Sequence, residues 1–153
     1  MLRRWQRLRG TLSRLGRSRL ATVVKSIEEP PVRILMVEDD PLVRELVVDA
    51  LREEGYEVFH ASNGEQALAL CKRQIADVLV TDIRLPGGVD GWQIAERCRE
   101  HDPQLQVIYA TGFSPVEARP VPGSLTLHKP YQPDRIVEAV RQMGKERRPP
   151  SIS

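Results

Sequence analysis

The sequence predicts an α/β fold in which helices cover both faces of a doubly wound parallel sheet of five strands. Short apolar runs alternate with amphipathic helical segments between residues 32 and 144. The first run, Val32–Val37, is apolar at nearly every position, which is typical of a strand buried on both faces of a parallel sheet. Alternation of strands and helices indicates a parallel sheet, because each helix crosses over and packs back on it.

The boundaries of the elements follow from capping residues and helix breakers. Asp40 before Pro41 is a helix N-cap followed by proline at the first helical position, and Gly55 ends that helix. Right-handed crossovers place the carboxyl ends of all strands at one edge. In the flavodoxin-like order 2-1-3-4-5, the functional crevice lies at that edge between strands 1 and 3. Strands are expected at 32–37, 56–61, 77–81, 105–110 and 124–127, and helices at 41–54, 65–74, 91–101 and 133–144.

Charge and proline content divide the chain into three parts. Residues 1–31 form a basic amphipathic extension and linker, residues 32–144 the folded domain, and residues 145–153 a tail that we expect to be disordered. The extension carries eight Lys/Arg and two Glu, whereas residues 32–144 carry 12 basic and 18 acidic side chains. The net charge of +2 therefore hides an acidic domain, and we expect no nucleic-acid partner.

The extension repeats apolar residues at helical spacing, with arginines between them, and three interpretations remain open. Residues 1–20 could contact an anionic membrane surface peripherally, bind a partner protein as a helix, or be a solvated extension. The apolar runs of the whole chain are far shorter than the roughly 20 residues that span a bilayer. The apolar residues concerned are Leu2, Trp5, Leu8, Leu12 and Leu15.

The two cysteines suggest a reducing environment. Cys71 and Cys98 both fall within predicted helices and form no CxxC motif. We expect them to be small buried side chains with free thiols, and the protein to be cytoplasmic.

Acidic residues follow both strands that border the predicted crevice. Glu38, Asp39 and Asp40 end strand 1, and Asp82 ends strand 3. Asp40 is explained as a helix cap, but carboxylates gathered this closely repel one another unless a cation offsets them. Oxygen ligands without His or Cys suit a hard ion, and the sequence therefore predicts a Mg²⁺ site.

Four segments give the sequence a more specific resemblance. They are 34–41 (ILMVEDDP), 80–91 (VTDIRLPGGVDG), 110–112 (ATG) and 128–131 (HKPY). In order and position they resemble the signature segments of the response-regulator receiver family, including its chemotaxis-type single-domain members. The resemblance covers about residues 32–144 and implies a two-component phosphorelay, with a histidine kinase or phosphotransfer protein as partner.

The resemblance also implies roles for the residues that would handle the phosphoryl group. Asp82 matches the phosphoacceptor, and Thr111 the hydroxyl that hydrogen-bonds the phosphoryl group. Lys129 matches the lysine that pairs with phosphoryl oxygens, and its bond to Pro130 is expected to be cis. The protein would be a phosphoacceptor rather than an enzyme with a separate substrate.

For the metal, the resemblance implies ligands from both strand ends. Asp39 and Asp82 match the acids that bind Mg²⁺, and Glu38 matches the one that usually acts through water. The backbone carbonyl of Arg84, two residues after the phosphoacceptor, would complete the set.

Two departures from the family pattern concern the segment after the fourth strand. Thr126 stands where most members have Tyr or Phe, which puts the usual Thr/Tyr switch in doubt. Residues 111–123 contain three prolines, so we expect the fourth helix to be truncated or irregular.

Other functional classes fit less well. Phosphatases of the haloacid-dehalogenase type carry a second Asp two residues after the nucleophile, where this chain has Arg84. A flavodoxin would need a Ser/Thr/Gly phosphate cradle after strand 1 in place of the acids. No effector domain is expected after residue 144. An adaptor of the same fold that binds proteins without being phosphorylated remains an alternative.

Overall fold

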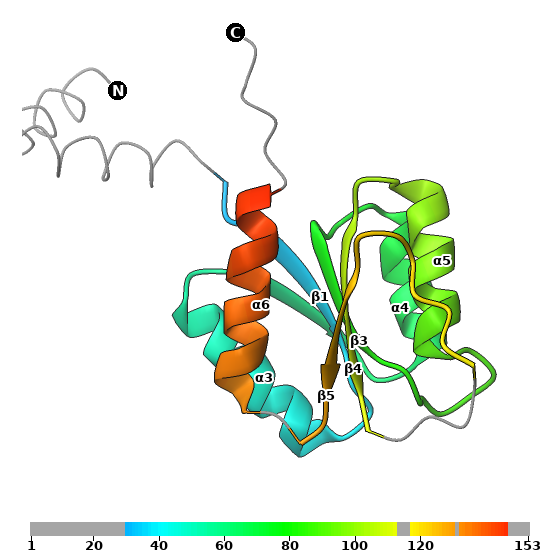
Figure 1. Cartoon of the computed structure of the whole chain (residues 1–153), viewed down its shortest axis with the longest axis horizontal. Coiled ribbons are helices and arrows are strands. Elements are labelled where there is room, and N and C mark those ends of the chain that lie inside the picture. The colour runs from blue at the N-terminus through cyan, green and yellow to red at the C-terminus, as the bar shows by residue number, and fades with distance from the viewer. Residues whose placement is uncertain (1–29, 113–116, 131, 147–153) are drawn as a thin grey trace, which may run out of the picture. The chain divides into compact units, whose positions relative to one another are not determined.

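The computed structural model describes residues 30–112, 117–130 and 132–146. The predicted helix of residues 1–20 and the tail from residue 147 onward lie outside this range. The chain divides after Pro31, and the unit that begins at Val32 contains every described helix and strand (Figure 1). Its last helix continues to Glu146, two residues beyond the predicted boundary of the domain at residue 144.

Five parallel strands form a single sheet in the order β2-β1-β3-β4-β5, as predicted. The three central strands are buried on both faces. Ile34 and Met36 of β1 point into one core cluster, and Leu35 and Val37 into the other, all fully buried. The strands are β1 (Arg33–Val37), β2 (Glu57–Ala61), β3 (Val78–Asp82), β4 (Gln106–Thr111) and β5 (Leu125–His128).

Two pairs of helices cover the two faces of the sheet (Figure 1). One core cluster lies beneath α4 and α5, and the other beneath α3 and α6. No helix in the described part of the chain is long and apolar enough to cross a bilayer. The helices are α3 (Pro41–Glu53), α4 (Gly64–Lys72), α5 (Gly91–His101) and α6 (Pro133–Glu146).

The first turn of α3 is capped as predicted. The Asp40 side chain accepts hydrogen bonds from the backbone nitrogens of Leu42 at 2.9 Å and Val43 at 3.3 Å. At the other end, Gly55 adopts a φ of 92°, a conformation that favours glycine. These two signals confirm the predicted span of this helix to within a residue or two.

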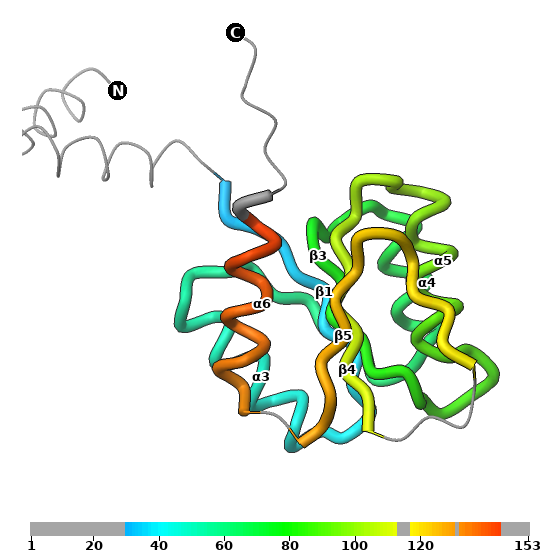
Figure 2. Tube along the Cα trace, in the orientation of Figure 1, coloured from blue at the N-terminus to red at the C-terminus, as the bar shows by residue number. Residues whose placement is uncertain are grey.

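Between β4 and β5 the described residues 117–123 contain no helix, which is consistent with the expected truncated or irregular fourth helix. The segment is attached to α5 and β4 instead. The Tyr109 hydroxyl accepts a hydrogen bond from the backbone nitrogen of Val121 at 3.2 Å, and Arg99 donates to the carbonyl of Pro122 at 2.6 Å. The Tyr109 ring packs against Trp92 of α5 with ring centroids 4.4 Å apart. The described residues 117–123 (yellow to orange in Figure 2) are therefore held by hydrogen bonds to β4 and α5.

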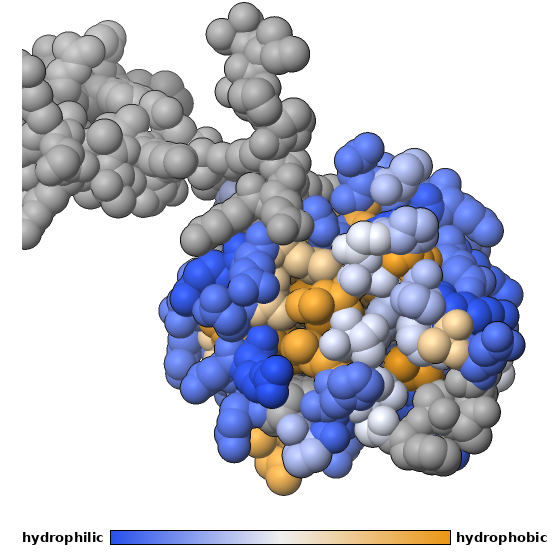
Figure 3. Space-filling model, in the orientation of Figure 1, coloured by the Kyte–Doolittle hydropathy of each residue, from blue (hydrophilic) through white to orange (hydrophobic). Residues whose placement is uncertain are grey.

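β5 forms one edge of the sheet and is only partly buried. Leu125 and Leu127 pack against the cluster beneath α3 and α6 without being enclosed by it. Figure 3 shows apolar surface in the middle of this view, between α6 and β5, with hydrophilic residues around it.

The expectation of two free thiols is wrong. Cys71 of α4 and Cys98 of α5 form a disulfide, with Cα atoms 5.3 Å apart and a sequence separation of 27. Both lie on the inner sides of helices that pack side by side (Figure 2). The two cysteines pair because the helices pack together, and no local sequence motif predicts this packing.

We predict that Gly91→Ala destabilises the fold. A Cβ at residue 91 would collide with the backbone oxygen of Asp82 and lie 2.8 Å from the Cα of Ile83. Because both are backbone atoms, the chain must shift, and we expect a loss of about 1–3 kcal/mol in the free energy of unfolding. Urea denaturation measures this loss. Gly88→Ala is the control: a Cβ there meets nothing within 4 Å, and equal losses in the two variants would contradict the prediction.

Candidate functional site

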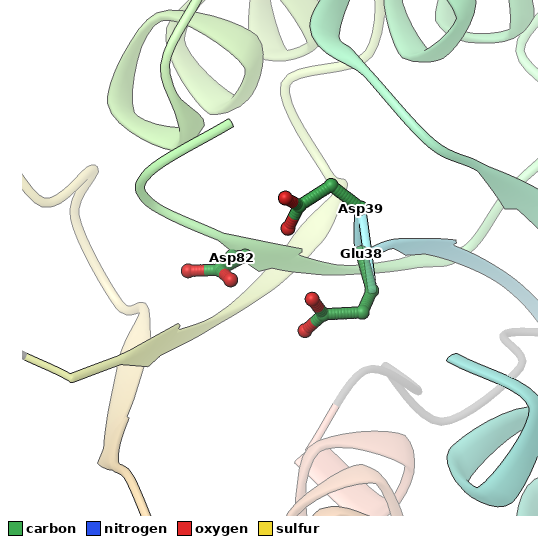
Figure 4. A group of neighbouring side chains, drawn as sticks. All are labelled: Glu38, Asp39 and Asp82. Atoms are coloured by element: carbon green, nitrogen blue, oxygen red, sulfur yellow. The ribbon is translucent and has the colours of Figure 1, made fainter. Parts of the chain in front are cut away.

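Three carboxylates meet at the carboxyl edge of the sheet. Val37 of β1 pairs with Thr81 of β3, so the residues that follow, Glu38 and Asp82, come from adjacent strand ends. Oxygen atoms of Glu38, Asp39 and Asp82 all lie within 4.8 Å of one another. In Figure 4 the three side chains converge from β1 and β3 on a common space. The structure thus brings together the acids that the sequence predicted.

Glu38 is the most enclosed of the three, with 1% of its surface exposed. Its Oε1 accepts a hydrogen bond from the backbone nitrogen of Asp40 at 3.1 Å. Arg44, one turn into α3, donates from Nη1 to the Glu38 backbone carbonyl at 2.8 Å. The sequence analysis missed Arg44, although its place in the first turn after the acidic run was the available signal. These bonds hold the end of β1 in position.

Lys129 supplies the positive charge of the site. Its Nζ lies 2.9 Å from Asp82 Oδ2 and 3.1 Å from Glu38 Oε2. The lysine follows β5, where its backbone nitrogen donates to the Thr111 carbonyl at 2.6 Å. The bond from Lys129 to Pro130 is cis, as expected. One ammonium group therefore bridges the ends of β1 and β3.

The pKa values of the bridged groups reflect this arrangement. Burial raises the pKa of Glu38 above its ordinary value. The charge of Asp82 also raises this pKa, and the hydrogen bond from Asp40 lowers it without cancelling the effect of burial. Burial alone would lower the pKa of Lys129, but its bonds to Asp82 and Glu38 and their charges raise it above the ordinary value. The lysine is therefore firmly charged, while Glu38 holds its proton more readily than a solvated glutamate.

The two remaining predicted residues lie near Asp82, Thr111 on the adjacent strand and Arg84 in the sequence. Thr111 ends β4 next to Ala110, the residue that pairs with Asp82 across the sheet. Thr111 is buried, and its hydroxyl donates to the Gly112 carbonyl at 3.3 Å. Arg84 lies two residues beyond Asp82 with an exposed side chain. The participation of its carbonyl as a ligand stays a prediction.

The loop after Asp82 is held by backbone contacts that the sequence analysis did not identify. The Gly91 backbone nitrogen at the start of α5 donates to the Ile83 carbonyl at 2.8 Å. The Thr81 hydroxyl donates to the Asp82 carbonyl, also at 2.8 Å. The first turn of α5 thus fits closely beneath Asp82, and this fit requires a residue without a Cβ at position 91.

The donor set fits a hard divalent cation. The three side chains offer only carboxylate oxygens, and Asp39 is exposed to solvent, which leaves room for the waters that Mg²⁺ retains. Lys129 offsets part of the negative charge of Glu38 and Asp82. Glu38, Asp39 and Asp82 are therefore the residues that would hold Mg²⁺.

Comparison with known proteins identifies the family of this chain. Residues 34–141 match the family model of the response regulator receiver domain. The chain is 35% identical over 115 residues to the response regulator receiver protein CpdR of Brucella abortus (strain 2308), covering 72% of this chain and 95% of the relative. It is 33% identical to sporulation initiation phosphotransferase F of Bacillus subtilis (strain 168), covering 72% and 91%.

The solved structures include a response regulator receiver protein from Sinorhizobium medicae WSM419. It is similar with a TM-score of 0.72 and 32% identity, over 77% of this chain and 98% of that one. The chain also matches several proteins named as transcriptional regulatory proteins, of which it spans only about half.

We predict that the affinity for Mg²⁺ rises with pH through the raised pKa of Glu38 and levels off above it. Metal binding needs the ionised carboxylate, so the retained proton competes with the ion at lower pH. Titration of Mg²⁺ at a series of pH values, followed by calorimetry, measures the effect. Glu38→Gln should flatten the dependence on pH, whereas Glu45→Gln on the exposed side of α3 should leave it intact. A wild-type affinity that does not change with pH would contradict this linkage.

We also predict that Lys129→Met destabilises the metal-free protein by about 2 kcal/mol, since two facing carboxylates lose their counter-charge. Mg²⁺ should restore much of this loss, so thermal unfolding should show a larger stabilisation by Mg²⁺ in the variant than in the wild type. Lys72→Met removes an exposed lysine of α4 as a control and should behave like the wild type. Equal stabilisation of Lys129→Met and the wild type would refute the prediction.

Proposed function

The chain belongs to the response-regulator receiver family, and from this membership we propose that it accepts a phosphoryl group onto Asp82 from a histidine kinase or a phosphotransfer protein. Receiver domains of two-component systems act with such partners. The observation that carries the proposal is the contact of Lys129 Nζ with Asp82 Oδ2 at 2.9 Å, at the edge of the sheet where the carboxylates gather. Further support comes from the relative named as a phosphotransferase.

Asp82 is the proposed nucleophile. One of its carboxylate oxygens attacks the phosphorus of a phosphohistidine, the P–N bond breaks, and the imidazole of the donor leaves with the electron pair. The attack brings one anion toward another, so neutralisation of charge is the main requirement. The Lys129 ammonium already lies against the attacking carboxylate, and its raised pKa keeps it charged throughout.

Glu38, Asp39 and Asp82, together with the Arg84 carbonyl, are the proposed holders of Mg²⁺. When bound, the ion neutralises charge on the phosphoryl oxygens and on the facing carboxylates. The hydrogen bonds to Glu38 from the Asp40 nitrogen and to its carbonyl from Arg44 keep this acid in place. In this proposal they orient the metal-binding edge of β1.

Thr111 is proposed to hydrogen-bond the phosphoryl group once it is on Asp82. Its place beside Ala110, which pairs with Asp82, supports this role. The hydroxyl now donates to the Gly112 carbonyl through a weak bond of 3.3 Å, and it can exchange this bond for a phosphoryl oxygen by rotation about χ1. The protein in this proposal is a cytoplasmic phosphoacceptor rather than an enzyme with a separate substrate.

Phosphorylation by a small-molecule donor tests the proposal. With Mg²⁺ and either acetyl phosphate or phosphoramidate, the wild type should gain the mass of one phosphoryl group, and hydroxylamine should remove it as expected for an acyl phosphate. Asp82→Asn should gain none, because the amide is not a nucleophile. Asp49→Asn, which alters an exposed aspartate of α3, should still be phosphorylated. Intact mass spectrometry reads out all three proteins.

The alternative, a receiver-fold adaptor that acts by protein binding alone, predicts a different result. It predicts that the wild type keeps its mass under all conditions. A phosphoryl group that persists in Asp82→Asn would place the acceptor elsewhere and contradict the assignment of Asp82.

A further inference from the structure

The disulfide between α4 and α5 lies outside the carboxylate site and has no part in the proposed phosphoryl transfer. Cys71 and Cys98 are the only cysteines of the chain, so neither has another partner within it. We propose that this disulfide is a reversible redox site, opened by a dithiol reductant and closed again by a disulfide oxidant. Its state then sets how tightly α4 and α5 are held together.

The surroundings of the bond determine where a reductant attacks. Cys71 is 9% exposed and Cys98 1%, and both line a shallow surface pocket with Gln74, Ile75 and Leu105. An incoming thiolate that enters the pocket therefore has better access to Cys71, the more exposed of the two cysteines. This difference in exposure gives the exchange a preferred direction, with attack at Cys71.

The reaction is ordinary thiol–disulfide exchange. A thiolate of the reductant attacks Cys71 Sγ, the Sγ–Sγ bond breaks, and Cys98 leaves as a thiolate that takes up a proton. The second thiolate of the reductant then attacks its own sulfur in the mixed disulfide, and Cys71 leaves as a thiolate and is protonated. Two electrons pass to the protein, and the reductant becomes a disulfide.

The fold tolerates both states of the bond. Cys71 and Cys98 belong to the larger core cluster beneath α4 and α5, in which Ala67, Ile94 and Ala95 hold the helices to the sheet without the bond. Two thiols pack in such a core as small apolar side chains. The bond is thus an addition to an existing core, unlike the disulfides that replace a core in small secreted domains.

Cellular location gives a reason for reversibility, and this step rests on the proposed function. A partner of a cytoplasmic kinase works in a compartment whose thiol pools reduce exposed disulfides. Disulfides in that compartment are mostly transient, catalytic or redox-sensing. A bond whose two cysteines line a surface pocket fits that group.

Thermal unfolding and hydrogen exchange of the full chain test the proposal. Dithiothreitol under native conditions should open the bond, shown by two alkylated cysteines in intact mass. The melting temperature should then fall by about 10 °C, and amides of α4 and α5 should exchange faster while those of α3 and α6 do not. Oxidised glutathione should reverse each change. The double variant Cys71→Ala/Cys98→Ala should have the melting temperature and amide exchange of the reduced wild type, and neither reagent should change them.

Two single variants test the direction of attack. Cys98→Ala leaves Cys71 alone and should form a mixed disulfide with oxidised glutathione quickly, whereas Cys71→Ala should react at least about tenfold more slowly, since the remaining cysteine is the less exposed of the two. Equal rates would overturn the assignment of Cys71 as the attacked sulfur.

Two outcomes overturn the proposal as a whole. The bond could resist dithiothreitol until the protein unfolds, which would make it a permanent structural link. It could also fail to form in glutathione buffers that oxidise other native dithiols. Neither outcome involves Asp82, and the same experiments on Asp82→Asn should give the wild-type result, so failure here is separable from failure of the phosphorylation test.

Discussion

The site depends on the ion pairs between one ammonium group and two carboxylates at the carboxyl edge of the sheet. Carboxylate oxygens of Glu38, Asp39 and Asp82 lie within 4.8 Å of one another, and Glu38 is almost completely buried. Such a group is stable only if positive charge lies beside it. Lys129 provides that charge at 2.9 Å from Asp82 and 3.1 Å from Glu38, while burial, the largest cause, keeps the pKa of Glu38 above its ordinary value. Carboxylate oxygens gathered in this way are the ligands that a hard divalent cation prefers.

The parallel sheet brings the charged side chains of the site together at one edge. Adjacent strands β1 and β3 end in register, so Glu38 and Asp82 emerge side by side, and β4 and β5 deliver Thr111 and Lys129 to the same edge. A shift of one residue in any strand would turn its side chains to the opposite face. Register is secured by the double burial of the strands, because the alternating side chains of β1 fill separate core clusters. The packing of the core and the geometry of the site are therefore set by the same constraint.

The face covered by α4 and α5 differs in how it is held. Gly91 lets the first turn of α5 approach the backbone of Asp82, and Arg99 and Tyr109 hydrogen-bond the backbone of the described segment before β5. On the same face the disulfide joins the two helices near their carboxyl-terminal ends, away from the carboxylates. In the layer formed by α4 and α5, Gly91 thus supports the loop after Asp82 at one end, and the disulfide links the two helices at the other.

The sequence by itself determined the α/β class, the strand order, most element boundaries and the set of acids at the crevice. These follow from hydrophobic periodicity, from caps such as Asp40 and from the rule that parallel strands end at one edge, all of which act over short stretches of chain or through topology. Only the tertiary structure decided that Cys71 bonds to Cys98, that Arg44 holds the Glu38 carbonyl and that burial raises the pKa of Glu38. Each of these depends on distances and solvent exclusion between packed segments, which no local pattern encodes.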